Sequence, residues 1–161
     1  KIIGLLLGDS LKKESHQKDI ESNLLKILLS FHSVKIKLRP HPQLIDNVYL
    51  KFLTSHSKIN DHIVIDSDSC IDNFLNSVNC IVTHSITSVA VQALVRNVPV
   101  IEYNIYEEES INFESIDTFG MVYYSNSYKD LKLNINNYLN LDISDKNNNY
   151  TAFYNRYLIN E

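Results

Sequence analysis

The stretch Val34-Lys35-Ile36-Lys37-Leu38-Arg39-Pro40-His41-Pro42 decides how this chain is interpreted. Apolar and basic residues alternate from residue 34 to residue 38, which is typical of a β-strand. An arginine, a histidine and two prolines follow the strand at once. Each proline fixes its own φ and favours extended geometry in the residue before it, so we expect a stiff loop that presents Arg39 and His41. Open parallel sheets bind ligands just beyond such carboxyl ends of strands.

Short apolar runs alternate with helical periodicity along the rest of the chain. The runs predict strands over residues 2–7, 34–38, 63–65, 80–83, 99–103 and 121–124. Apolar residues at helical spacing predict helices within 20–31, 44–52, 71–78, 86–97, 127–139 and 150–158. Asn97 is expected to end the fourth of these helices in a left-handed conformation, and Ser127 with Asp130 to cap the fifth. This rhythm predicts an α/β fold, a three-layer Rossmann-like domain with a mostly parallel sheet of about six strands.

Composition bounds the domain organisation and the class of partner. We expect a single Rossmann-like domain over residues 1–141, whose strand ends suit a nucleotide-sugar, then over 142–161 an Asn-rich linker and a C-terminal helix that packs on the same domain. The chain enters an apolar strand directly after Lys1, which indicates a piece of a longer protein. A net charge of −4 argues against a general nucleic-acid surface. No apolar run approaches the roughly 20 residues that span a bilayer.

Glycine and cysteine positions exclude several chemistries. The three glycines are Gly4, Gly8 and Gly120, with which neither a GxGxxG dinucleotide fingerprint nor a GxxxxGK[ST] phosphate loop can be written. Cys70 and Cys80 have neither CxxC nor zinc-site spacing, so reduced thiols are expected. The chain also contains no HExxH or GxSxG motif.

Two segments, about forty residues apart, have the residue types that bind a phosphate group. Arg39 supplies a fixed cation and His41 a hydrogen-bond donor, and each hydrogen bond to a charged group contributes about 1.5–3 kcal/mol. Ser85, Thr87 and Ser88 follow the strand over 80–83 and open a helix, whose backbone N–H groups favour anions. The structural alternatives are a rigid turn and ordinary helix N-caps. We expect both segments to lie at the same edge of the sheet.

Further polar residues follow other predicted strands. Gly8, Asp9 and Ser10 close the first strand, either as a turn or as contacts to the ligand. Asp66-Ser67-Asp68 has the DxD form of some metal sites, but we favour capping of the next helix by Asp68 or Ser69, with Asp66 available to a base or ribose. Gln92 and Glu102 are candidate contacts to sugar hydroxyls, and the alternative for Gln92 is an exposed helix position.

Taken in order, these segments resemble the donor-binding, C-terminal half of GT-B glycosyltransferases. More narrowly, they resemble bacterial capsule and surface-polysaccharide biosynthesis proteins with an HP motif and a Ser/Thr motif. The resemblance covers roughly residues 2–103. It is carried by Gly8-Asp9-Ser10, Arg39-Pro40-His41-Pro42, Thr83-His84-Ser85-Ile86-Thr87-Ser88, Ala93-Leu94 and Pro99-Val100-Ile101.

The resemblance implies a metal-independent glycosyltransferase that needs no cofactor besides its nucleotide-sugar donor. The donor would be a CMP-linked sugar such as sialic acid or Kdo, although related teichoic-acid polymerases use CDP-linked alditols. His41 would contact the donor phosphate and help the nucleotide leave, while Ser85, Thr87 and Ser88 would bind the same phosphate. The enzyme would be cytoplasmic, in solution or at the inner face of the cell membrane.

The resemblance also implies partners and limits. A glycan acceptor and a second, N-terminal GT-B domain would complete the enzyme, so this piece should bind nucleotide weakly and transfer nothing alone. The family has Glu where Gln92 stands and Gly where Asn97 stands, which leaves the donor open. Two other functions remain possible from the sequence: a sugar-nucleotide epimerase-like domain that uses a UDP-sugar, and a non-catalytic α/β binding or interaction module.

Overall fold

A computed structural model describes residues 1–7, 14–41, 61–84, 87–104 and 119–157. It contains a six-stranded sheet with the strand order β3-β2-β1-β4-β5-β6, in which the pairs β1–β2, β2–β3, β4–β5 and β5–β6 are parallel. The predicted α/β class is therefore confirmed. The elements follow the chain as β1 (Ile2–Leu7), α1 (Glu14–Leu29), β2 (Lys35–Pro40), β3 (Ile63–Ile65), α3 (Ile71–Asn76), β4 (Cys80–Thr83), α4 (Ser88–Val95), β5 (Val100–Tyr103), β6 (Val122–Ser125), α5 (Tyr128–Asn140) and α6 (Ile143–Tyr157).

The chain divides into two compact units, Lys1–Asn79 and Cys80–Glu161. The first carries β1, β2 and β3, and the second carries β4, β5 and β6. The domain boundary expected at residue 141 stays a prediction.

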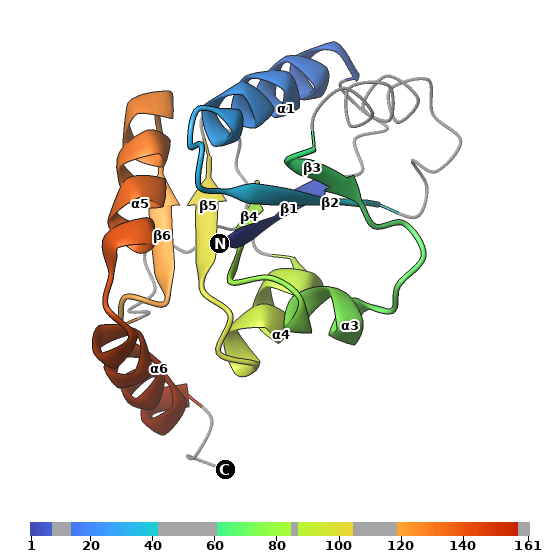
Figure 1. Ribbon diagram of the computed structural model, residues 1–161. Helices are drawn as coiled ribbons and strands as arrows, with labels where there is room; N and C mark the ends of the chain where they lie inside the picture. Colours follow the sequence, from blue (N-terminus) through green and yellow to red (C-terminus); the bar gives the residue numbers. More distant parts are fainter. Residues whose placement is uncertain (8–13, 42–60, 85–86, 105–118, 158–161) are drawn as a thin grey trace. The chain divides into compact units, whose positions relative to one another are not determined.

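In the first unit, α1 and α3 lie on opposite sides of β1, β2 and β3 (Figure 1). Ile36 and Leu38 of β2 are buried, whereas Lys37 and Arg39 between and beyond them are only partly buried. Successive strand residues point to opposite faces. Because Lys37 approaches Phe74 of α3, the basic residues of β2 lie on the α3 face and its apolar residues on the α1 face.

In the second unit, polar residues fix the ends of the helices as the sequence predicted. The Ser127 side chain accepts a hydrogen bond from the backbone N–H of Asp130, at 3.1 Å, and caps α5. Asn97 has φ of +59°, which confirms the left-handed end of α4. The backbone N–H groups of Asn97 and Val98 donate to the carbonyls of Leu94 and Ala93, at 3.1 and 2.8 Å. This pair of bonds is the Schellman arrangement, which satisfies the last carbonyls of the helix.

Helix α6 corrects the linker that the sequence predicted over residues 142–149, because this Asn-rich run is helical from Ile143 onward. Tertiary packing outweighs the low helix propensity of asparagine here. Phe153 is buried, the Tyr150 hydroxyl donates to the Val95 carbonyl at 3.1 Å, and the Lys146 Nζ lies 4.3 Å from the centre of the Tyr138 ring. Burial raises the pKa of Tyr138.

Other element boundaries differ modestly from expectation. Strand β2 continues through Pro40, so Arg39 belongs to the strand rather than to the loop after it. Helix α1 begins at Glu14, ahead of the helix expected from residue 20. The buried face of α5 consists of Leu131, Ile135 and Tyr138. The helix predicted over 44–52 lies outside the described residues.

Candidate functional site

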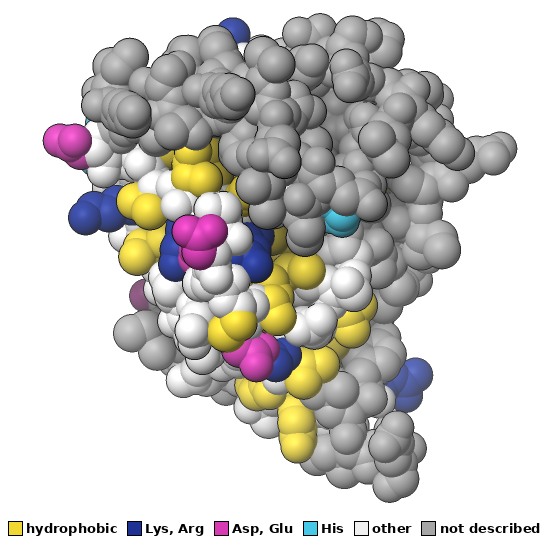
Figure 2. All heavy atoms as spheres, turned by 90° about the vertical axis from the view of Figure 1, so that its right-hand side faces the viewer, with side chains coloured by type: hydrophobic (Ala, Val, Ile, Leu, Met, Phe, Trp, Pro, Cys, Tyr) yellow, Lys and Arg dark blue, Asp and Glu magenta, His cyan; other side chains and the backbone are white. Residues whose placement is uncertain are grey.

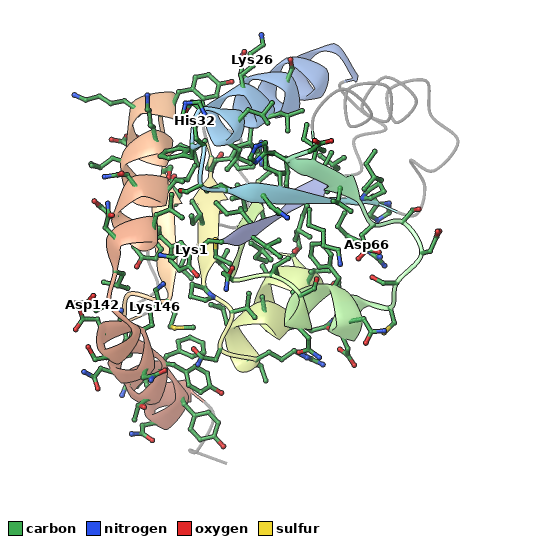
Figure 3. The ribbon with its side chains drawn as sticks, viewed as in Figure 1. Lys1, Lys26, His32, Asp66, Asp142 and Lys146 are labelled. Atoms are coloured by element: carbon green, nitrogen blue, oxygen red, sulfur yellow. The ribbon has the colours of Figure 1, made fainter. Side chains whose placement is uncertain are left out.

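A cluster of polar side chains lies at the carboxyl ends of β2 and β3 in the first unit. It consists of Lys37, Arg39, Asp66, Ser69 and Ser77, and we call it the Asp66 cluster. The register of the two parallel strands pairs Leu38 with Ile65, and so brings the residues that follow them together. Asp66 is labelled in Figure 3 at the end of its strand.

Both carboxylate oxygens of Asp66 are occupied. Oδ2 lies 2.7 Å from the Lys37 Nζ and accepts a hydrogen bond from the Ser69 hydroxyl at 2.6 Å. Oδ1 accepts from the Ser69 backbone N–H at 3.1 Å. The side chain is only 9% exposed, so these contacts are largely shielded from water. Asp66 is therefore a structural centre of the cluster, and the base or ribose contact expected for it stays a prediction.

Arg39 approaches Asp66 differently from Lys37. Its Nη1 donates to the backbone carbonyl of Asp66 at 3.1 Å, whereas the carboxylate Oδ1 is 3.5 Å away. Lys37 makes the shorter ion pair and donates a second hydrogen bond to the Ser77 hydroxyl at 2.8 Å. Lys37 was not among the candidate residues from the sequence, because a lysine in an alternating strand is the ordinary solvent-facing residue.

An aromatic ring lies beneath the two basic side chains. Phe74 of α3 is fully buried, and its ring centre is 5.7 Å from the Lys37 Nζ and 5.9 Å from the Arg39 Cζ. A cation at this distance from a ring face is attracted by about 0.5–1 kcal/mol or more. The ring thus helps to position both cations between β2 and α3.

The cluster contains two cations and one carboxylate, so its net charge is positive. Figure 2 looks onto the side where Asp66 is labelled in Figure 3, and shows basic and acidic side chains adjacent to one another among hydrophobic ones. Burial by itself would raise the pKa of Asp66, but hydrogen bonds from Lys37 and Ser69 and the charge of Lys37 lower it from 3.8 to about 2. The carboxylate is therefore ionised at neutral pH.

We expect the Asp66 cluster to make stability depend on acid pH. The folded-state pKa lies below the unfolded value of 3.8, so the stabilisation is complete above pH about 4 and is lost as pH falls toward about 2. The shift corresponds to at most about 2 kcal/mol, and partial exposure of the cations reduces our expectation to about 1 kcal/mol. Urea unfolding at pH 2 to 6 should show this loss in the wild type and not in Asp66→Asn.

The matched control for this experiment is Asp68→Asn, because Asp68 is exposed and accepts a hydrogen bond from the Ser67 hydroxyl at 3.0 Å. It should keep the wild-type pH dependence. An Asp66→Asn protein that loses stability in acid as steeply as the wild type would contradict the role assigned to the carboxylate.

The second unit contains the amino terminus of α4. Thr87 is the N-cap, and its Oγ1 accepts a hydrogen bond from the Ala90 N–H at 3.0 Å. Because a hydroxyl can accept and donate at once, the proton of Thr87 remains able to donate to another group. Ser88 is exposed at the first helical position, and Gln92 is partly exposed one turn later.

Buried polar side chains follow the ends of β4 and β5. Glu102 is fully buried within β5, in register with Thr83 of β4 and Tyr124 of β6. Asn104 is buried directly after β5, and its N–H donates to the Ser125 carbonyl at 2.7 Å. The sequence analysis included Glu102 among the candidates but not Thr83 or Asn104. Both could have been noticed, because each is a polar residue at the end of an apolar run.

Two residues beside the candidate positions have defined structural contacts. His84 packs edge-on against Tyr103, with ring centres 5.3 Å apart. Cys70, rather than Asp68 or Ser69, is the N-cap of α3 and makes no side-chain cap hydrogen bond. The predicted cap was wrong, and Ser69 instead donates its N–H and its hydroxyl to the Asp66 carboxylate.

The candidate residues are distributed as follows. Arg39, His41 and Asp66 belong to the first unit, and Thr87, Ser88, Gln92 and Glu102 to the second. The structure brings Arg39 and Asp66 together. The remaining candidates, Gly8, Asp9, Ser10 and Ser85, lie outside the described residues.

The described residues contain neither a group of metal ligands nor a membrane-spanning helix. Within those residues, no three His, Cys, Asp or Glu side chains are grouped so that they could hold a metal ion. In the same part of the chain, every helix is too short or too polar to cross a bilayer.

No protein-family model matches the chain, and no curated protein matches it. Solved structures do match its fold. A variant of S. aureus TarM in complex with fondaparinux, α-GlcNAc-glycerol and UDP is 14% identical, with a TM-score of 0.64 over 98% of this chain and 32% of that protein. The chain therefore has an α/β, Rossmann-like fold similar to part of this GT-B protein. This confirms the fold that the resemblance implied, one half of a GT-B architecture.

Two further structures show how widely this domain fold occurs. Methanocaldococcus jannaschii UDP-GlcNAc 2-epimerase in complex with UDP-GlcNAc and UDP is 18% identical, with a TM-score of 0.63 over 88% of this chain and 39% of the epimerase. Thermosulfurimonas dismutans KpsC, a β-Kdo 2,4 transferase, is 13% identical, with a TM-score of 0.51 over 82% and 43%. The chain therefore spans about a third to two fifths of the length of these GT-B-type proteins. At these identities the likeness is one of fold alone.

Proposed function

We propose that this chain is the donor-binding domain of a glycosyltransferase that acts in capsule or surface-polysaccharide biosynthesis. The observation that carries the proposal is the fold likeness to one domain of TarM, KpsC and a UDP-GlcNAc epimerase, combined with Arg39 at the carboxyl end of β2. Ligands of open α/β sheets bind beyond this edge. The acceptor and the second GT-B domain would be partners outside this sequence.

The proposed chemistry is stabilisation of the departing nucleotide phosphate by fixed donors. Arg39 and His41 would donate to phosphate oxygens, together with Ser85, Thr87 and Ser88 at the start of α4. Supporting this, the Thr87 hydroxyl caps α4 through its lone pair and keeps its proton for an anion. Donors that are already oriented stabilise developing charge without reorganisation, so the proposed reaction uses no metal.

The proposed donor is a CMP-linked sugar, in agreement with the HP and Ser/Thr motifs and with the fold likeness to a Kdo transferase. A UDP-sugar is the second candidate, because TarM and the M. jannaschii epimerase are both seen in complex with UDP. Gln92 and Glu102 would be the candidate contacts to donor hydroxyls. The proposed location is the cytoplasm or the inner face of the cell membrane.

Thermal unfolding in the presence of CMP, CDP, UDP or buffer tests the proposal. A nucleotide present at about ten times its Kd should raise Tm by roughly 3–5 °C, which corresponds to about 1.4 kcal/mol. We expect CMP to have the largest effect and His41→Ala to abolish it. His32→Ala is the matched control, because His32 is an exposed histidine of the same unit that is not a candidate.

The other outcomes of this experiment are equally informative. A preference for UDP that also depends on His41 would favour the epimerase-like function. Absence of stabilisation by any of the three nucleotides, with the wild type folded, would contradict nucleotide binding and favour an interaction module.

A further inference from the structure

The geometry points to Lys37 as a positioning residue that keeps the charge of Arg39 available for a phosphate group. This inference rests on the proposed function, and it concerns a residue that the HP and Ser/Thr motifs do not include. Lys37 would act through Asp66, by occupying the carboxylate that Arg39 would otherwise bind.

The first step of the argument is the unequal sharing of Asp66. Lys37 Nζ is 2.7 Å from Oδ2, whereas Arg39 Nη1 is 3.5 Å from Oδ1. Arginine ordinarily forms the better pair with a carboxylate, because its planar fork matches both oxygens. Here the fork is not used in that way. Ser69 donates to both oxygens and, together with Lys37, fills the positions that a two-pronged arginine would need.

The second step concerns what holds Arg39 instead. Its Nη1 donates to the backbone carbonyl of Asp66 at 3.1 Å, a neutral acceptor. Within the described part of the chain, Nη1 is the only guanidinium nitrogen of Arg39 for which the structure shows a hydrogen bond. Arg39 is thus oriented by the bond to the Asp66 carbonyl and by the Phe74 ring, while its ion pair with the Asp66 carboxylate, at 3.5 Å, is longer than the 2.7 Å pair of Lys37.

The third step is the accessibility of the two cations. Their side chains are about equally exposed, 20% for Lys37 and 19% for Arg39, so exposure alone does not distinguish them. Their partners do. Lys37 contacts Asp66 and Ser77 and lies over Phe74, whereas Arg39 lies two residues further along β2, nearer to His41. The cation nearer to the strand end is therefore the one with the looser ion pair to Asp66.

A double-mutant cycle on Lys37 and Asp66 tests this inference, with affinity for CMP, UDP and inorganic pyrophosphate measured by calorimetry. Lys37→Met should let Asp66 capture Arg39 and weaken binding about tenfold. Lys37→Met/Asp66→Asn removes the competing carboxylate together with the lysine, so affinity should return to within about twofold of the wild type. If Lys37 itself bound the phosphate, the double variant would stay as weak as Lys37→Met.

Lys35→Met is the matched control for charge. Lys35 is exposed and lies two residues before Lys37, so it has the same strand face and the same charge but is further from the strand end. It should change affinity by less than about twofold. An equal loss in Lys35→Met and Lys37→Met would mean that only net charge matters, and would overturn the inference.

Arginine side-chain NMR gives a second measurement that needs no ligand. The chain has only three arginines, Arg39, Arg96 and Arg156, so their Nε–H signals can be assigned by substitution. Lys37→Met should shift the Nε–H signal of Arg39 and make its side chain less mobile, because Asp66 then binds it more closely. The signals of Arg96 and Arg156 should stay unchanged. An Arg39 signal that is identical in Lys37→Met and wild type would overturn the inference.

The two measurements separate this inference from the proposed function. If the wild type binds none of the three ligands, donor binding is contradicted. The NMR comparison then still decides whether Lys37 keeps Asp66 away from Arg39.

Discussion

Phe74→Ala should lower the free energy of unfolding by about 3–5 kcal/mol, the range for removal of a fully buried aromatic side chain. Phe74 is 0% exposed and is the buried aromatic residue of the six-residue helix α3. Because the whole stability of a domain is about 5–15 kcal/mol, this single change should leave the first unit marginal. Urea unfolding monitored by circular dichroism is the appropriate measurement.

Two further variants separate packing from electrostatics at Phe74. Leu75→Ala removes an adjacent side chain that is also 0% exposed, and should cost about 2–5 kcal/mol. Phe74→Leu keeps most of the apolar volume but removes the ring beneath Lys37 and Arg39. It should cost about 1–2 kcal/mol and also weaken any anion bound at Arg39. A loss below about 1 kcal/mol in Phe74→Ala would show that the core described around α3 is wrong.

Gly120→Ala should destabilise the second unit by about 2 kcal/mol. Gly120 has φ of +75°, where an alanine costs about 1–2 kcal/mol, and a Cβ there would lie 2.6 Å from the Asn149 Nδ2. The steric part adds to this cost, while the smaller entropy of the unfolded alanine chain offsets about 0.4–1 kcal/mol. For a chain of this size the expected decrease in Tm is about 4–8 °C.

The companion variant Gly120→Ala/Asn149→Ala separates the two causes. It removes the amide that the new Cβ would meet, so only the cost of the backbone conformation should remain. The double variant should therefore be more stable than the sum of the single changes. A strictly additive result would mean that α6 does not lie against the turn before β6.

Strands and helix ends could be predicted from local sequence because each depends on neighbouring residues. The apolar runs of β1, β3 and β4 match the structure, as do the Ser127 cap and the left-handed Asn97. In these places the side chain and the backbone groups that it satisfies lie within a few residues of each other.

Prediction failed where a distant contact outweighs local preference. The run over 142–149 reads as a linker because asparagine is a poor helix former, yet Tyr150 and Phe153 anchor the helix that contains it. The cap of α3 was misassigned within a local contact instead, since Ser69 donates to the side chain of Asp66, three residues earlier.

The candidate site divides in the same way. Arg39 was recognisable as a cation at a strand end, because strand pattern and proline positions are local properties. Its relation to Lys37 and Asp66 was not recognisable, because it arises from the pairing of β2 with β3 and from the position of the Phe74 ring.

By itself, the sequence determined the α/β class, the order of the strands along the chain and the residue types available at their ends. The tertiary structure decided which of two similar cations Asp66 binds closely and which it holds in a longer ion pair. The physical reason is that the strength of an ion pair depends on the distance between its charges, here 2.7 against 3.5 Å, and that these pairs join residues 29 and 27 positions apart in the chain. Hydrophobic periodicity contains no such information.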